Sequence, residues 1–259
     1  MKRAVVIIGF GELGSVFARG FLRLGYPVYP VTRKISIADA ITNYPEPKFV
    51  LAAVGEEDLS HVLTTIPAQW RNRMGLLQNE LLPYQWEVHN IDGPTVAIVW
   101  FEKKIGQDYK VLLPSCIYGP NADFLADSLE NLEIPSRILW SEEELLFELV
   151  LKNLFVFTIN IAGLKTGGTV RTLWKEHNEL ARQIADEVID LQELLTGATF
   201  PRNLLIKGLV EAINSDPEHK CKGRSAPERL IRVVNIADET GLQLPKIREI
   251  QMGSVCANL

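Results

Sequence analysis

The fold is decided near the start of the chain, by Ala4-Val5-Val6-Ile7-Ile8-Gly9-Phe10-Gly11-Glu12-Leu13-Gly14. Residues 4–8 are apolar and predict a buried strand, and the residues after them match the pattern Gly-x-Gly-x-x-Gly. Apolar residues then recur at helical spacing, at Leu13, Val16, Phe17, Phe21 and Leu24. Gly25 suits the position just past the end of a helix. A strand, a glycine-rich turn and a helix in this order indicate the first half of a βαβ unit.

The three glycines of this turn each have a physical purpose in a nucleotide-binding loop. The first permits a tight turn, the second lets the backbone approach a pyrophosphate, and the third lets the helix pack against the strand. The N–H groups at the start of the helix attract the negative charge. We therefore predict a dinucleotide site formed by Gly9, Phe10, Gly11, Glu12, Leu13 and Gly14. The alternative is a tight strand-to-helix turn that holds no ligand.

The end of the second predicted strand bears on the kind of dinucleotide. A site for NAD usually has an acid about 20 residues after the loop, where it holds the 2′-hydroxyl of the ribose. Here Arg33 and Lys34 stand at that point, and the next acid is Asp39. Arg33 can grip a 2′-phosphate with two hydrogen bonds, and Lys34 adds a point charge. This pair predicts NADP (NADPH) as the cofactor, and a solvated basic corner is the alternative.

Short apolar runs alternate with helical patterns through the first half of the chain. We predict strands over residues 28–31, 49–54, 75–78, 96–101, 110–113 and 134–139, and helices over residues 58–66 and 122–132. Strands that alternate with helices indicate a parallel, doubly wound sheet. The sequence therefore predicts an α/β fold in which residues 1–140 form a Rossmann-type domain that binds the dinucleotide.

From Ser141 onward only helical patterns occur. Ser141 and Glu144 match a capping box, and a long apolar helix follows. Further helices are predicted over residues 176–195, 202–214 and 226–240, with Gly241 just past the last one. We therefore expect a smaller all-α domain over residues 141–259. By analogy with other helical domains of this kind, it is expected to bind the substrate and to support a homodimer.

The composition limits the kinds of partner. Charged residues make up 23% and hydrophobic residues 47%, as in ordinary folded domains. The net charge of −5 argues against binding to nucleic acid or to an acidic membrane surface, because either would need a basic surface. The three cysteines form no Cys-x-x-Cys pair and the histidines do not cluster, so neither a disulfide framework nor a metal site is predicted.

Two apolar stretches bear on the location of the protein. The first is interrupted by the glycine pattern and has no cleavage site, so it does not resemble a signal peptide. The second, over residues 145–164, contains Glu148, Lys152, Asn153 and Asn160. These polar groups favour a buried helix over a membrane span. We therefore expect a cytoplasmic protein that makes no membrane contact.

Lys152 is the unusual residue of this apolar helix. Because the helix is apolar nearly all round, Lys152 must either extend to solvent at a domain edge or face a partly buried cleft. Burial disfavours the charged form of a lysine, so in a cleft it can donate a proton to a carbonyl oxygen as hydride reaches the carbon. Asn160 lies two turns further along the same face and is a candidate to orient a substrate. The pattern alone leaves both interpretations of Lys152 open.

Four features taken together resemble the ketopantoate reductase (2-dehydropantoate 2-reductase) family. They are the glycine loop, Gln78-Asn79, the helix with Lys152, and Ser-Ala-Pro-Glu-Arg-Leu at residues 225–230. These features occur in the family's order over nearly the whole chain, which is identified as a divergent member. The resemblance implies an enzyme that reduces a small 2-keto acid to a 2-hydroxy acid with NADPH.

The resemblance also implies roles for particular residues. Lys152 is the implied general acid, and Asn79 is the implied contact to the cofactor or the substrate. Ser215 and Glu228 fall near the family's C-terminal serine and glutamate, so Ser215 is expected to bind substrate and Glu228 to take part in catalysis. Glu228 has a second explanation, because in the Ser-Ala-Pro-Glu segment it occupies the N3 position of another capping box.

Three positions depart from the family pattern. Val156 stands where the family usually has an asparagine one turn after the lysine, and Gly55-Glu56-Glu57 where it often has a lysine. Glu80 stands where a glycine commonly follows the asparagine. A site that loses an amide loses a hydrogen bond, and such sites discriminate strongly between partners. Two alternatives therefore stay open: a catalytically inactive NADP-binding regulatory or partner protein, and a reductase of another substrate, such as a β-hydroxy acid or an imine.

Overall fold

The computed structural model describes the backbone of residues 2–256 and the side chains of residues 2–253. The chain forms two compact units, one up to Leu149 and one from Val150 onward. The division falls inside helix α6 (Glu142–Thr166), whose first turns belong to the first unit. The sequence suggested a boundary near residue 140, where this helix begins.

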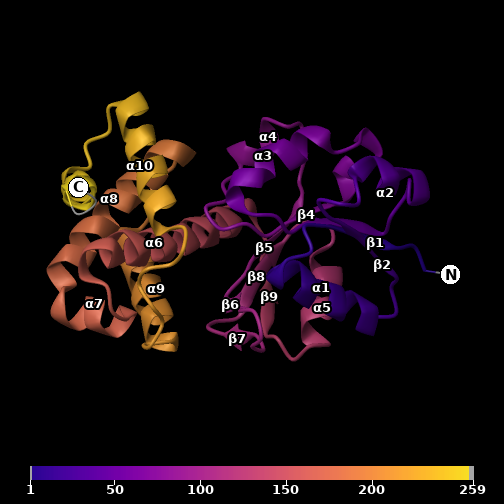
Figure 1. Ribbon diagram of the computed structural model, residues 1–259, viewed down its shortest axis with the longest axis horizontal. Coiled ribbons are helices and arrows are strands. Elements are labelled where there is room, and N and C mark those ends of the chain that lie inside the picture. Colours follow the sequence, from indigo (N-terminus) through magenta and orange to yellow (C-terminus); the bar gives the residue numbers. More distant parts are fainter. Residues whose placement is uncertain (1, 257–259) are drawn as a thin grey trace. The chain divides into compact units, whose positions relative to one another are not determined.

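The first unit is built on a seven-stranded sheet with strand order β2-β1-β3-β4-β5-β8-β9 (Figure 1). Its strands are β1 (Val5–Ile8), β2 (Val28–Val31), β3 (Phe49–Ala52), β4 (Met74–Leu76), β5 (Thr95–Ile98), β8 (Ser115–Tyr118) and β9 (Ser136–Ile138). The chain passes from β1 to β2 on one side and then returns to β3 on the other side of β1. Loops that follow strands at such a reversal diverge and leave a crevice. The predicted doubly wound α/β fold is confirmed.

The middle of the sheet differs from the prediction. Strand β8 was not predicted, because its four residues lie in a short segment between Pro114 and Pro120 that is typical of a loop. It is buried and pairs antiparallel with β5, so the sheet is not wholly parallel. The predicted strand over residues 96–101 is interrupted after Ile98. Its last residue begins β6 (Phe101–Glu102), which pairs with β7 (Lys110–Val111) in a separate two-stranded sheet.

Helices cover both faces of the large sheet (Figure 1). Helices α1 (Glu12–Arg23) and α5 (Ala122–Glu130) lie on one face, where their aromatic rings join the core. Phe21 of α1 stacks on Phe124 of α5 with ring centres 5.1 Å apart. The other face carries α2 (Ile37–Asn43), α3 (Glu56–Thr65) and α4 (Tyr84–Glu87), and the short helix η1 (Ala68–Arg73) leads into β4. Helix α2 was not predicted, although Ser36 and Asp39 form a capping box at its start.

The second unit is helical, as predicted. After α6 it contains α7 (Val170–Glu176), α8 (Asn178–Thr196), α9 (Arg202–Ser215), α10 (Ala226–Thr240) and α11 (Pro245–Cys256). The predicted helix over residues 176–195 is α8, and α7 ends before it because the backbone of His177 leaves the helical conformation. Helix α11 was not predicted. Its first N–H groups, on Lys246 and Ile247, donate to the buried carboxylate of Glu187 at 2.7 and 2.9 Å.

Helix α6 is long and apolar enough to cross a membrane by length and composition, and it is the one such helix among the described residues. However, 78% of its most apolar window is buried inside the protein. At its start the backbone N–H of Glu144 donates to the Ser141 hydroxyl at 3.2 Å, as the capping box predicts. The Glu144 carboxylate accepts from the N–H of Trp140, one residue earlier than a capping box requires. The predicted box is therefore half formed.

Candidate functional site

The glycine loop has the geometry that its sequence pattern requires. Gly9 has a φ of +89°, and a Cβ there would lie 2.6 Å from the carbonyl oxygen of Ala53. A Cβ on Gly14 would lie 2.2 Å from the carbonyl oxygen of Gly9, so the helix and the turn touch through backbone alone. Gly11 caps α1, and a Cβ there would meet no atom within 4 Å. The backbone of Gly11 is therefore open to a ligand.

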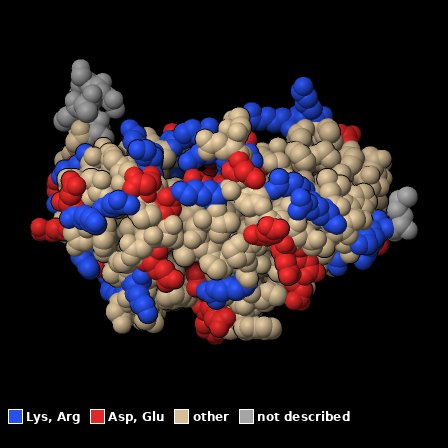
Figure 2. All heavy atoms as spheres, turned by 90° about the horizontal axis from the view of Figure 1, so that it is seen from below, with Lys and Arg blue, Asp and Glu red and all other residues tan. Residues whose placement is uncertain are grey.

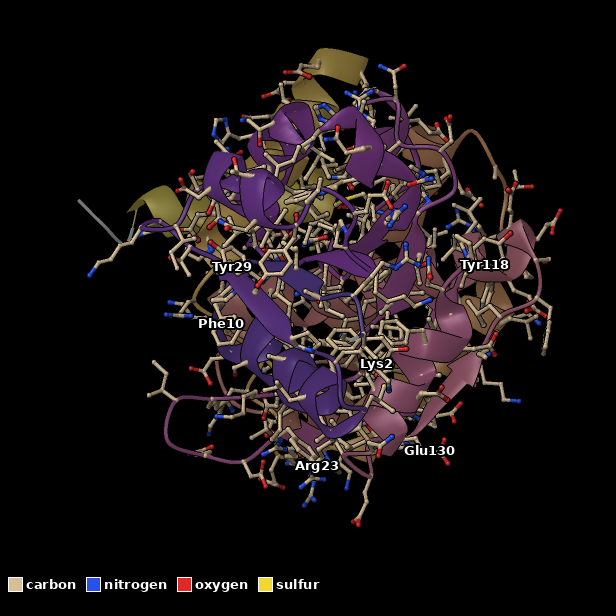
Figure 3. All side chains as sticks on the ribbon, turned by 90° about the vertical axis from the view of Figure 1, so that its right-hand side faces the viewer. Lys2, Phe10, Arg23, Tyr29, Tyr118 and Glu130 are labelled. Atoms are coloured by element: carbon tan, nitrogen blue, oxygen red, sulfur yellow. The ribbon has the colours of Figure 1, made fainter. Side chains whose placement is uncertain are left out.

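A cleft of about 600 Å³ opens at this loop. Its walls belong to three segments of the first unit, and its lining residues are Ile8, Gly9, Phe10, Gly11, Val31, Thr32, Arg33, Ser36, Ile37, Val54, Asp58, His61, Val62 and Thr65. Phe10, which Figure 3 shows by the start of α1, is 44% exposed. The cleft joins the loop after β1 to the segments after β2 and β3, which is where doubly wound sheets bind nucleotides.

The basic pair after β2 lies on a tight turn. Thr32 and Ile35 exchange two backbone hydrogen bonds of 3.0 and 3.2 Å, and Arg33 and Lys34 form the exposed turn between them. Arg33 lines the cleft, whereas Lys34 does not. The nearest acid in sequence, Asp39, is engaged in capping α2: it accepts from the Ser36 hydroxyl at 2.7 Å, which lowers the pKa of Asp39. The turn thus brings a cation, and no acid of its own, to the cleft.

A salt bridge that the sequence did not predict lies at the glycine loop. Glu12 is the first residue of α1, and its carboxylate pairs with Lys103 Nζ at 3.0 Å. Lys103 follows β6 and is mostly buried, with 19% of its side chain exposed. A carboxylate at a helix N-terminus competes with a bound anion for the same N–H groups, and the lysine offsets that charge. No motif marks Lys103, because 91 residues separate it from Glu12.

Helix α3 supplies a wall of the cleft that no sequence motif marks. Asp58, His61, Val62 and Thr65 lie at helical spacing on one face and all line the cleft. A different face, with Ser60 and Thr64, contacts the imidazole of His89 at 3.1 and 3.3 Å. The helical period of residues 58–66 was the signal available for this wall, since it separates the two faces.

Asn79 follows β4 and is half-buried. The next residue, Glu80, has a φ of +61°, a conformation in which glycine is the favoured residue. Glu80 thus stands at a position with an unusual backbone requirement. Before them, the buried amide of Gln78 donates to the carbonyl oxygens of Ala52 and Val54 at 2.7 and 3.3 Å. These bonds fix the segment that carries Asn79 to the end of β3.

The remaining predicted residues lie in the second unit. Lys152 is half-buried on α6, and its Nζ lies 5.9 Å from the centre of the Phe155 ring. Asn160, two turns on, is buried, and its amide oxygen accepts from Arg229 Nη1 of α10 at 3.0 Å. That oxygen is engaged inside the unit. Val156, between them, is buried and apolar.

Ser215 and Glu228 have different surroundings. Ser215 ends α9, and its hydroxyl donates to the carbonyl oxygen of Ala212 at 2.8 Å. Glu228 is exposed in the first turn of α10. The second capping box is wrong: Ser225 has φ −85° and ψ 13° rather than an extended backbone, and its side chain makes no capping hydrogen bond. The helix cap therefore does not explain Glu228.

Two of the three cysteines lie within the described side chains, and Cys256 lies outside them. Both are buried, and burial raises the pKa of Cys116 to about 12 and that of Cys221 to about 11. These thiols stay protonated near neutral pH, which makes them poor nucleophiles. Neither Cys116 nor Cys221 is therefore a candidate nucleophile.

No protein-family model matches the chain, and no curated protein matches it in sequence. Solved structures do match it. A PanE/ApbA family ketopantoate reductase from Ralstonia eutropha is 14% identical and matches over 99% of this chain and 98% of its own, with a TM-score of 0.70. D-mandelate dehydrogenase, solved with NADH and anilino(oxo)acetate, is 12% identical over 100% of both chains, with a TM-score of 0.67. A dimeric ketopantoate reductase from Staphylococcus aureus is 14% identical over 98% of both chains, with a TM-score of 0.63.

These matches span both units of the chain. The protein therefore has the fold of the ketopantoate reductases over its full length, and the resemblance inferred from its motifs is confirmed at the level of the fold. The same fold is used by an enzyme that was solved with NADH, so the fold by itself does not select between the two nicotinamide dinucleotides.

Proposed function

We propose that this protein is an NADPH-dependent reductase that converts a small 2-keto acid to a 2-hydroxy acid. The observation that carries the proposal is the cleft of about 600 Å³ at the Gly9–Gly14 turn. It occurs in a fold shared with ketopantoate reductases and D-mandelate dehydrogenase. The neighbours are oxidoreductases, and a dinucleotide cleft is the feature that such a reaction needs first.

The residues of the cleft fit a dinucleotide phosphate. The open backbone at Gly11 and the start of α1 would hold the pyrophosphate through N–H groups. Arg33 would grip a 2′-phosphate with its guanidinium group, and Lys34 would add a second positive charge from the same turn. Asp39, the acid nearest in sequence, caps α2 instead. We therefore favour NADPH over NADH.

When bound, the nicotinamide supplies the hydride that reduces the carbonyl carbon. Lys152 Nζ donates a proton to the carbonyl oxygen, so that hydride and proton together give the hydroxyl of the product. Lys152 is half-buried beside Phe155, so part of its side chain is shielded from solvent. We assign the orientation of the substrate to Asn79, Asn160 and Ser215, and a supporting catalytic role to the exposed carboxylate of Glu228.

Two further properties belong to this proposal. We propose a homodimer, because a neighbour with the same fold is a dimeric enzyme. Light scattering coupled to size-exclusion chromatography would measure the mass of the assembly.

We also propose that the protein works in the cytoplasm. Figure 2 shows acidic and basic side chains interspersed over one face, without a broad field of one sign that would attract nucleic acid or a membrane.

The proposal is tested by following oxidation of NADPH, with NADH alongside, against a panel of 2-keto acids that includes ketopantoate and phenylglyoxylate. We expect Lys152→Ala to lower turnover by about 10²–10⁴-fold, because it removes the proton donor, while NADPH still binds. Lys165→Ala is the matched control, since Lys165 lies on the same helix but pairs with Glu249 at the surface. Unchanged turnover in Lys152→Ala would contradict the mechanism.

Two results would redirect the proposal. Binding of NADPH without oxidation by any 2-keto acid, β-keto acid or imine would favour a regulatory or partner protein. Oxidation with imines or β-keto acids alone would keep the enzyme and change its substrate. Imines and β-keto acids belong in the panel because the buried Val156 offers no side-chain hydrogen bond at a position where the ketopantoate reductase family usually has an asparagine.

A further inference from the structure

The face of α3 that lines the cleft carries an acid in its first turn. Glu56, Glu57 and Asp58 occupy that turn, and of these three Asp58 alone lines the cleft. It is followed on the same face by His61, Val62 and Thr65. Acids in a first turn commonly stabilise the helix, which explains their presence but not the exposure of one of them to the cofactor cleft.

The charge of Asp58 is not balanced by a neighbour. Asp58 is exposed and makes no salt bridge among the residues that the structure describes. Asp39 differs, because its carboxylate is held by Ser36. Glu57 differs too, because its carboxylate oxygens approach Gly55, within about 3 Å of where a Cβ would stand there. The cleft therefore contains one cation, Arg33, and one acid with no partner.

We propose that Asp58 is a specificity determinant that opposes Arg33 and reduces the preference of the cleft for NADPH over NADH. This inference rests on the proposed function only in requiring that the cleft binds a nicotinamide dinucleotide. A 2′-phosphate adds negative charge at the adenosine end of the ligand, so a carboxylate in the same cleft repels NADPH more than NADH. A carboxylate also accepts hydrogen bonds from ribose hydroxyls, which favours NADH further.

The size of the effect follows from Coulomb's law for charges at a solvated surface. Charges separated by several ångströms at a solvated surface change affinity by roughly threefold to tenfold, and salt weakens the effect because the Debye length is about 8–10 Å. Asp58 thus reduces the selectivity that Arg33 provides without removing it. The protein is expected to bind both dinucleotides, with a moderate preference for NADPH.

The test is calorimetric titration of the full-length protein with NADPH and with NADH, at low and high salt. We expect Asp58→Asn to raise the ratio of NADPH to NADH affinity by roughly threefold to tenfold at low salt and by less at high salt. Glu57→Gln is the matched control: it removes the same charge from the same turn, outside the cleft, and should change the ratio by less than about twofold. Arg33→Ala should lower the ratio.

The outcomes separate this inference from the proposed function. An unchanged ratio in Asp58→Asn, or an equal loss of both affinities, would overturn the role of Asp58 while leaving the dinucleotide site in place. Asp58→Gln should reproduce the shift, and its failure to do so would also count against the inference. A wild-type protein that binds neither dinucleotide would overturn both proposals. A shifted ratio in a protein that reduces no keto acid would support this inference and contradict the reductase.

Discussion

The glycine loop of residues 9–14 and the helical second unit hold their candidate functional groups in opposite ways. At the loop, the groups that would meet a ligand are backbone atoms and exposed side chains, such as Gly11 and Arg33. In the second unit, two of the predicted side chains already serve the fold: Asn160 accepts from Arg229, and Ser215 donates to its own helix. A site made of backbone tolerates few substitutions but is visible in sequence. A site made of side chains can change its substrate while the helices stay in place.

The strongest test of this contrast replaces the loop glycines. Gly14→Ala would push a methyl group against the carbonyl oxygen of Gly9, so we expect a loss of roughly 1–3 kcal/mol in unfolding free energy. Both dinucleotides should then bind at least about tenfold more weakly, because the N–H groups of the loop are displaced. Thermal melting and calorimetric titration would measure the two effects.

Gly11→Ala is the matched control for that variant. Its methyl group meets no protein atom within 4 Å, so stability should fall by at most the small cost of alanine at a helix N-cap, while the pyrophosphate is obstructed. If Gly11→Ala binds dinucleotides as well as the wild type does, the loop does not approach a pyrophosphate. The contrast between the two regions would then have to be abandoned.

The second prediction separates structure from function at Asn160. Asn160→Ala removes one hydrogen-bond acceptor of Arg229, a buried cation, and should lower the unfolding free energy by about 1–3 kcal/mol. Asn160→Asp keeps an acceptor oxygen at the same place, so its melting temperature should stay near that of the wild type. If the amide also orients a keto acid, the new carboxylate should raise KM for the acidic substrate by repulsion.

Asn160→Asp with normal stability and normal KM would assign Asn160 to the fold alone. The side-chain site would then contain fewer residues than the family likeness implies. A stable Asn160→Ala variant would instead show that Arg229 does not depend on this oxygen, and the contrast with the loop would weaken.

The sequence predicted most of what local patterns can encode. The glycine turn, its flanking strands and the helical second half were readable, because each depends on residues close together in the chain. Strand β8 was not, since four residues near two prolines carry no clear period. Lys103 was not, because its partner Glu12 lies in a distant element. The α3 wall had a readable period, but the cleft that it faces exists only once the strands are in order.

The smallest expected effect concerns Lys103, where the loop depends on a side chain after all. Lys103→Met leaves the Glu12 carboxylate unbalanced beside the proposed pyrophosphate site. We expect both NADPH and NADH to bind roughly threefold to tenfold more weakly, with their ratio unchanged, because both carry the pyrophosphate. Combining Lys103→Met with Glu12→Gln should restore most of the affinity, since the double variant then has neither charge.

If the single variant changes the ratio of NADPH to NADH affinity instead, Lys103 acts at the adenosine end of the ligand. If the double variant stays weak, the lysine contacts the ligand directly, and the loop is less purely a backbone site than its glycines suggest.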